Sequence, residues 1–171
     1  MAITKGITSY VTLNEADSYF DNRLDVNAWL NADNQMKEQA LVTATLQMDE
    51  LSWAGQSQVS DQNLAFPRAG VFRDSSRGLN STFSSYTFVT TDEVETSLGR
   101  DIQLLRRATY ELAFHLLNNE GLIDKTGDVQ DIKVGSISLK KVYSASVLPN
   151  TIRKIVSPML SGGGSRNWEG Y

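Results

Sequence analysis

The sequence predicts a mainly α-helical fold: a small helical bundle with one long central helix, a short β-hairpin and an extended C-terminal tail. Three segments carry apolar residues at spacings of three and four, which is the period of a helix face. Residues 129–143 alternate with a period of two instead, and residues 161–171 are rich in glycine. We therefore expect a helical domain over residues 1–160 and a flexible tail over 161–171.

The first two helices are predicted over residues 13–24 and 34–53. Thr12 and Glu15 match a capping box, in which a hydroxyl and a carboxylate satisfy free amide groups at a helix start. Residues 25–31 are expected to form a break or a short turn. Asp33 or Asn34 can cap the second helix, and Gly55 can end it. Its apolar stripe consists of Leu41, Ala44, Met48 and Leu51.

A long loop and the longest helix follow. Residues 55–90 are rich in Gly, Ser, Asn and Gln, which predicts a loop with turns and a short extended stretch at 86–89. The third helix is predicted over 92–119 and carries two apolar stripes. Two stripes imply contacts on two sides, as in a central core helix or a helix at a subunit interface. The stripes are Ile102, Leu105, Ala108, Leu112 and Leu116, and Tyr110, Ala113, Phe114 and Leu117.

The alternating segment 129–143 predicts a β-hairpin or two edge strands. Its lysines, Lys133, Lys140 and Lys141, are typical of an edge protected from unwanted strand pairing. The alternative is that they face nucleic acid or an acidic partner. A short final helix is expected near 150–156, because Pro149 precedes it and Pro158 follows it.

Composition and motifs exclude most kinds of chemistry. The chain has no cysteine and a net charge of −4, which argues against general affinity for duplex DNA. His115 is the sole histidine, and a pair with Glu111 offers too few ligands for a metal. No catalytic or phosphate-loop motif is present, and no apolar run reaches the ~20 residues of a membrane span. We expect a non-enzyme that is made in the cytoplasm and needs no cofactor.

For two pairs of residues the sequence allows either a nucleic-acid-binding role or a structural role. Arg106 and Arg107 can bind phosphates, but such arginines more often pair with a carboxylate such as Asp101 or with a neighbouring subunit. Trp29 and Trp53 can stack on bases of a single strand. Their apolar surroundings favour packing in the core or at an interface.

The C-terminal tail carries aromatic residues for which folding gives no reason. Gly162, Gly163 and Gly164 form a flexible tether, and Arg166, Trp168 and Tyr171 follow it. Trp, Tyr and Arg are the residues most enriched at binding hot spots. We therefore expect the tail to bind a partner.

The chain also resembles a known family over most of residues 9–164. The resemblance rests on residues 9–20, which begin Ser9-Tyr10-Val11-Thr12, and on four later segments and the surroundings of Trp29. The family is that of tailed-phage head–tail connector (adaptor or head-completion) proteins, some of whose members are labelled DnaT-like single-stranded-DNA-binding proteins. The four later segments are residues 37–51, 64–71, 94–117 and 160–164.

The resemblance implies a structural role in the virion. Connector protomers form a ring, typically dodecameric, beneath the portal protein, where they join the head to the tail or nozzle proteins and line the channel for double-stranded DNA. The glycine tail, with Arg166, Trp168 and Tyr171, would dock on the portal. Arg106 and Arg107 would then lie between subunits, and Lys133, Lys140 and Lys141 would face the DNA channel.

The alternative function is single-stranded-DNA binding. Aromatic residues would serve as stacking platforms, and basic residues would contact phosphates. The acidic net charge weakens this alternative. The aromatic candidates are Trp29, Trp53, Tyr86 and Phe88, and the basic ones are Arg106, Arg107, Lys140 and Lys141.

Overall fold

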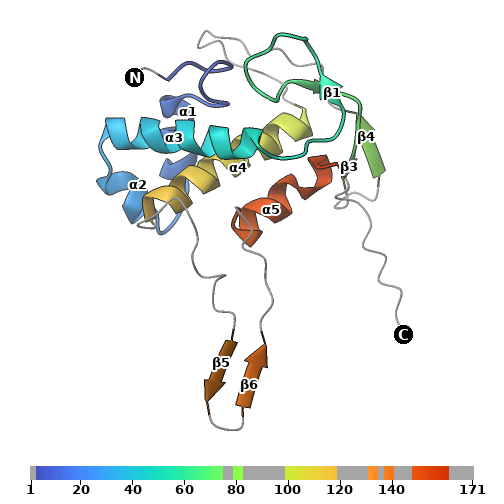
Figure 1. Ribbon diagram of the computed structural model, residues 1–171. Helices are drawn as coiled ribbons and strands as arrows, with labels where there is room; N and C mark the ends of the chain where they lie inside the picture. Colours follow the sequence, from blue (N-terminus) through green and yellow to red (C-terminus); the bar gives the residue numbers. More distant parts are fainter. Residues whose placement is uncertain are drawn as a thin grey trace.

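A computed structural model describes residues 3–74, 79–82, 99–118, 131–134, 137–140 and 148–161. The predicted fold class is confirmed, because this part of the chain is mainly helical and includes a short antiparallel hairpin (Figure 1). A 3₁₀ turn at Ser157–Met159 follows the last helix. The α-helices are α1 (Leu13–Asp21), α2 (Asn27–Asn31), α3 (Asn34–Asp49), α4 (Arg100–Asn118) and α5 (Asn150–Val156).

The predicted helix caps are present. The Thr12 hydroxyl accepts a hydrogen bond of 3.2 Å from the amide of Glu15, whose carboxylate accepts one of 2.8 Å from the Thr12 amide. Asp33 caps α3 by accepting a bond of 2.7 Å from the amide of Met36. Both helices end three or four residues earlier than predicted, at Asp21 and Asp49.

The predicted break at residues 25–31 contains a short helix, α2, so the sequence-based expectation is incomplete there. The reason is tertiary packing. Trp29 on α2 is only 1% exposed, and its ring lies 4.5 Å from the ring of Phe20. Burying so large a side chain fixes a helical turn that local propensity alone does not favour.

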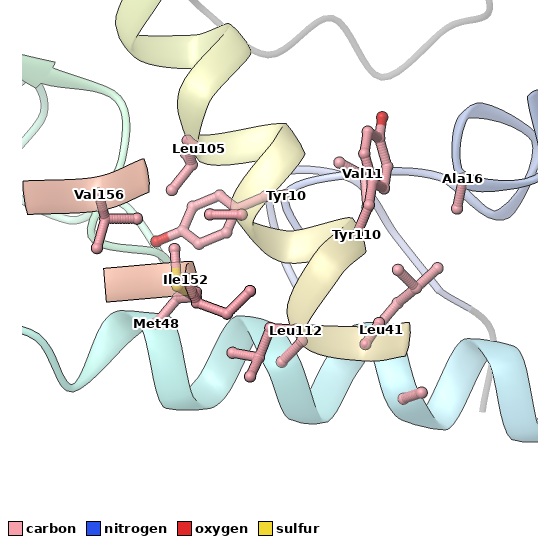
Figure 2. Packing of buried hydrophobic residues seen from close by; sticks show 14 of the residues in the cluster. Tyr10, Val11, Ala16, Leu41, Met48, Leu105, Tyr110, Leu112, Ile152 and Val156 are labelled. Carbon is pink, nitrogen blue, oxygen red and sulfur yellow. The ribbon is translucent and has the colours of Figure 1, made fainter. Parts of the chain in front are cut away.

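The long helix α4 lies at the centre of the hydrophobic core. It packs against α2, α3 and α5, and α1 contacts it through the ring of Tyr19, which stacks on Tyr110. Figure 2 shows Leu41 and Leu112 where α3 and α4 cross, and Met48 toward Ile152 of α5. Both predicted stripes of α4 therefore pack within the chain. Its buried apolar residues are Ile102, Leu105, Ala108, Tyr110, Leu112 and Ala113.

The region predicted as a long loop contains four short strands. Strand β1 (Gln56–Ser57) pairs with β2 (Arg68–Ala69), and β3 (Val71–Asp74) pairs with β4 (Leu79–Thr82), both antiparallel. The low hydrophobicity of this region hid these ribbons, because backbone pairing needs no apolar pattern. The extended stretch predicted at 86–89 lies outside the described residues. The predicted hairpin is β5 (Asp131–Val134) with β6 (Ile137–Lys140), which stands apart from the helices in Figure 1.

Arg68 fixes the polar region after α3 by binding backbone carbonyls. Its Nε donates to the carbonyl of Ala54 at 2.7 Å, and its Nη2 donates to that of Gly55 at 2.6 Å. Its Nη1 donates to the carbonyl of Ala65 at 3.2 Å. A guanidinium can satisfy several carbonyls at once because it presents five donors in one plane.

The C-terminal part of the domain pairs with the segment after α3. The amide of Ala54 donates to the carbonyl of Met159 at 2.8 Å. The amide of Ser161 donates to the carbonyl of Ser52, also at 2.8 Å. The chain therefore reaches the beginning of the glycine tail beside the end of α3.

A buried ion cluster joins the N-terminal loop, α1 and α4. Glu15 Oε1 lies 2.8 Å from Lys5 Nζ and 3.4 Å from Arg106 Nη1. Burial alone would raise the pKa of Glu15, but the hydrogen bonds from Lys5 and Thr12 and the charge of Arg106 outweigh it. The pKa of Glu15 is therefore lowered from its ordinary value of 4.5.

We predict that Glu15→Gln destabilises the protein by about 2 kcal/mol at pH 7, because it leaves the charges of Lys5 and Arg106 uncompensated. A carboxylate with a lowered pKa stabilises the fold above its unfolded pKa, and this contribution is lost as pH falls through the lowered value. Urea unfolding should therefore show that the free energy of unfolding of the unmodified protein exceeds that of Glu15→Gln by a constant amount above about pH 5. This difference should shrink below pH 4.5. A difference that grows toward acid pH would contradict this assignment.

Candidate nucleic-acid interface

Several residues singled out in the sequence lie outside the described part of the chain. They include the proposed tail residues Gly162, Gly163, Gly164, Arg166, Trp168 and Tyr171, together with Tyr86, Phe88 and Lys141. Lys133 and Lys140 belong to the β5–β6 ribbon, where Lys133 pairs with Ser138 and Lys140 pairs with Asp131.

The two tryptophans are structural. Trp29 is 1% exposed and Trp53 is 7% exposed. The indole N–H of Trp29 donates to Asp17 at 2.8 Å, and that of Trp53 donates to the carbonyl of Met48 at 2.9 Å. Neither ring has a face open to a base, so the favoured interpretation, packing in the core, is confirmed and the alternative of stacking on single-stranded DNA is excluded for both.

The adjacent arginines of α4 lie in different environments. Arg106 is 9% exposed and pairs with Glu15 in the buried cluster. Arg107 is exposed. Consecutive residues on a helix point about 100° apart, so one side of α4 faces the core while the next position faces solvent. Of this pair, only the guanidinium of Arg107 is on the surface.

Arg107 belongs to a group of polar and aromatic side chains that joins α1 to α4. We call this group the arginine–aromatic cluster. Tyr19 lies in the last turns of α1 and Arg23 directly after this helix, while the other three members come from successive turns of α4. The cluster consists of Tyr19, Arg23, Arg107, Glu111 and Phe114.

Glu111 is the hydrogen-bonding centre of the cluster. Its Oε1 accepts a bond of 2.6 Å from the Tyr19 hydroxyl, and its Oε2 forms an ion pair with Arg23 Nη1. The Arg23 guanidinium also lies 5.4 Å from the centre of the Phe114 ring, which is a cation–π distance. One carboxylate thus fixes the orientation of a phenol and a guanidinium from the neighbouring segment.

The rings of the cluster rest on the aromatic core. The Tyr19 ring stacks on Tyr110 with centroids 4.7 Å apart and an angle of 26° between the planes. The rings of Phe20 and Phe114 lie 5.7 Å apart. Tyr19 and Phe114 are themselves only partly buried. They therefore lie at the boundary between core and solvent, in contact with the rings of Tyr110 and Phe20.

The pKa of Tyr19 depends on its burial and on the charged groups of the cluster. Burial raises the pKa of Tyr19, and the hydrogen bond to Glu111 and the charge of that carboxylate raise it further. The charges of Arg23 and Arg107 oppose this rise in pKa. Both guanidinium groups are therefore close enough to act on the phenol.

The cluster has the groups that single-stranded nucleic acids require. Two guanidinium groups can contact phosphates, and partly exposed rings can stack on bases. Sequence reasoning assigned Tyr19 and Phe114 to packing and did not single out Arg23. The sequence placed Arg23 four residues after Tyr19, which is the spacing of neighbours on one helix face. It could not show that these residues meet α4, because the contact between Tyr19 and Glu111 joins residues 92 positions apart.

Other kinds of site find no support in the described residues. There, no group of three or more His, Cys, Asp or Glu side chains could hold a metal ion. None of the helices in the same part of the chain has the length and apolarity needed to cross a membrane.

Comparison with known proteins finds a similarity to a described family. Residues 2–82, a little under half of the chain, match the model of a family described as "Putative DnaT-like ssDNA binding protein". This match includes Tyr19 and Arg23 and excludes α4. No curated protein and no solved structure matches the chain significantly.

This finding corrects the expected identity. The matching family is described by single-stranded-DNA binding, and nothing in the comparisons indicates a head–tail connector. The expectations that depended on the connector resemblance are therefore also wrong. These are the portal and tail partners, the ring of subunits and the structural role in the virion. The two stripes of α4, which allowed a subunit interface, are instead covered by other helices of the same chain.

We predict that a fragment of residues 1–82, which spans the family match, does not fold alone. Without α4, the apolar side chains of Leu41, Ala44 and Met48 would lose the surface that buries them. Circular dichroism should show reduced helix content and no cooperative unfolding on heating. A fragment that unfolds cooperatively near the midpoint of the full chain would contradict this prediction.

Proposed function

We propose that the protein binds single-stranded DNA through the arginine–aromatic cluster on α1 and α4. The observation that carries the proposal is the placement of Arg23 over the ring of Phe114, with the exposed Arg107 one turn before Glu111 on α4, which binds Tyr19. The similarity of residues 2–82 to a family described by single-stranded-DNA binding supports the same function. The function is one of binding, and we assign no reaction to the protein.

The chemistry of the cluster suits a single strand better than a duplex. Bases of a single strand are free to stack on tyrosine and phenylalanine rings, whereas bases of a duplex are already stacked on each other. A chain with a net charge of −4 also lacks the broad basic surface that duplex binding needs. The two arginines supply a local positive site within an acidic protein.

The rigid support of the cluster favours binding. Tyr110 lies beneath Tyr19, and Glu111 holds Tyr19 and Arg23 in position. Side chains that are already ordered lose less conformational entropy when a ligand arrives.

We predict that Arg107→Gln weakens binding to a fluorescent oligothymidine of about 20 nucleotides by roughly three- to tenfold. Because the variant can no longer neutralise a phosphate at this position, the slope of log K against log salt should become less negative by about 0.7. Anisotropy titrations at several salt concentrations measure both quantities. Arg107 is exposed, so the substitution should not change the unfolding midpoint.

The matched control is Arg153→Gln. Arg153 is also exposed but lies on α5, and its replacement changes the net charge by the same amount. This variant should bind oligothymidine as the unmodified protein does. Equal weakening by both variants would show that only net charge matters, and would contradict the proposed site. Absence of binding by the unmodified protein at low salt would overturn the function itself.

A further inference from the structure

We propose that Tyr19, Arg23 and Arg107 form a phosphate-binding site that Glu111 occupies in the unbound protein as an internal mimic of phosphate. This inference rests on the proposed function, because the phosphate in question belongs to the bound DNA strand. It adds a regulatory role for Glu111, whose carboxylate would otherwise be an obstacle at the centre of a DNA site.

The contacts of Glu111 are those that a phosphate group would make. One carboxylate oxygen accepts the Tyr19 hydroxyl at 2.6 Å, and the other pairs with Arg23 Nη1. Phosphate oxygens bind hydroxyl and guanidinium donors in the same way. Arg107 lies four residues before Glu111, which is one turn earlier on the same side of α4.

Arg23 has donor capacity that Glu111 leaves unused. Its Nη1 is buried in the ion pair with Glu111, so the remaining donors of the guanidinium are the ones that a further anion can reach. The side chain as a whole is 35% exposed, whereas that of Glu111 is 12% exposed. Arg23 is thus open to solvent on one side and can turn toward an anion that arrives from that side.

The carboxylate must therefore weaken phosphate binding. A phosphate that approaches Arg23 meets the negative charge of Glu111, and the two anions repel each other. The same carboxylate keeps Tyr19 and Arg23 ordered when no strand is present. Glu111 is accordingly a positioning residue that preserves the site and sets its affinity below the maximum that the two arginines allow.

The test is Glu111→Gln, which keeps the shape of the side chain and its acceptor for Tyr19 but removes the charge. Binding of oligothymidine should become about five- to tenfold tighter. The salt slope should become more negative by about 0.7, because Arg23 is then free to bind a phosphate. A matched control is Glu50→Gln, an equal charge change at the exposed end of α3, which should leave affinity unchanged.

A double variant, Glu111→Gln with Arg23→Gln, separates this mechanism from a general change in charge. If Glu111 acts by restraining Arg23, the gain in affinity disappears in the double variant. A gain that persists without Arg23, or a folded Glu111→Gln protein that binds no more tightly than the unmodified one, would overturn the inference.

A second measurement does not depend on DNA. Inorganic phosphate at about 50 mM should raise the unfolding midpoint of Glu111→Gln by about 3 °C relative to sodium chloride of equal ionic strength. The unmodified protein should show a smaller rise. If no variant binds DNA but phosphate still stabilises Glu111→Gln selectively, the proposed function fails and the anion site stands. Equal stabilisation of both proteins would overturn the anion site.

Discussion

The structure depends on the burial of α4 on more than one side. A helix with two apolar stripes is stable in water only when both are covered, and here α2, α3 and α5 cover it while Tyr19 of α1 stacks on Tyr110. The rest of the core is arranged around this requirement, as Figure 2 shows for Leu41 and Leu112. On the side of α4 toward α1, Glu111 binds the Tyr19 hydroxyl and pairs with Arg23.

The arginine–aromatic cluster is a consequence of that arrangement. Packing of Phe20 and Tyr110 at the centre of the domain places Tyr19 and Phe114 at its boundary with solvent. Glu111 then satisfies the phenol of Tyr19 and the charge of Arg23, as the partial burial of these groups requires. The phenol of Tyr19 and the guanidinium of Arg23 therefore stabilise the contact between α1 and α4, and they are also the kinds of group that bind a nucleic-acid strand.

The sequence predicted the elements far better than the site. Local signals placed the caps at Thr12 and Asp33 and the final helix at residues 150–156, because each depends on neighbours in the chain. The helix α2 and the strands after α3 were missed, since burial of Trp29 and long-range pairing produce them. The cluster was missed for the same reason.

The two tryptophans show how apolar neighbours in the sequence indicate burial. Stacking on bases was the alternative for Trp29 and Trp53, but their apolar surroundings favoured packing, and both are core residues with satisfied indole groups. The resemblance to phage connectors led to the wrong partners, whereas residues 2–82 match a family described by single-stranded-DNA binding.

The central claim is that single-stranded DNA contacts the seam between α1 and α4. The most direct measurement is an NMR titration of ¹⁵N-labelled protein with a short oligothymidine. The account predicts that the largest shifts occur at the backbone amides and side-chain Nε–H groups of Arg23 and Arg107 and at the amides around Tyr19 and Phe114. Shifts confined to other parts of the chain, with these signals unchanged at saturation, would contradict it.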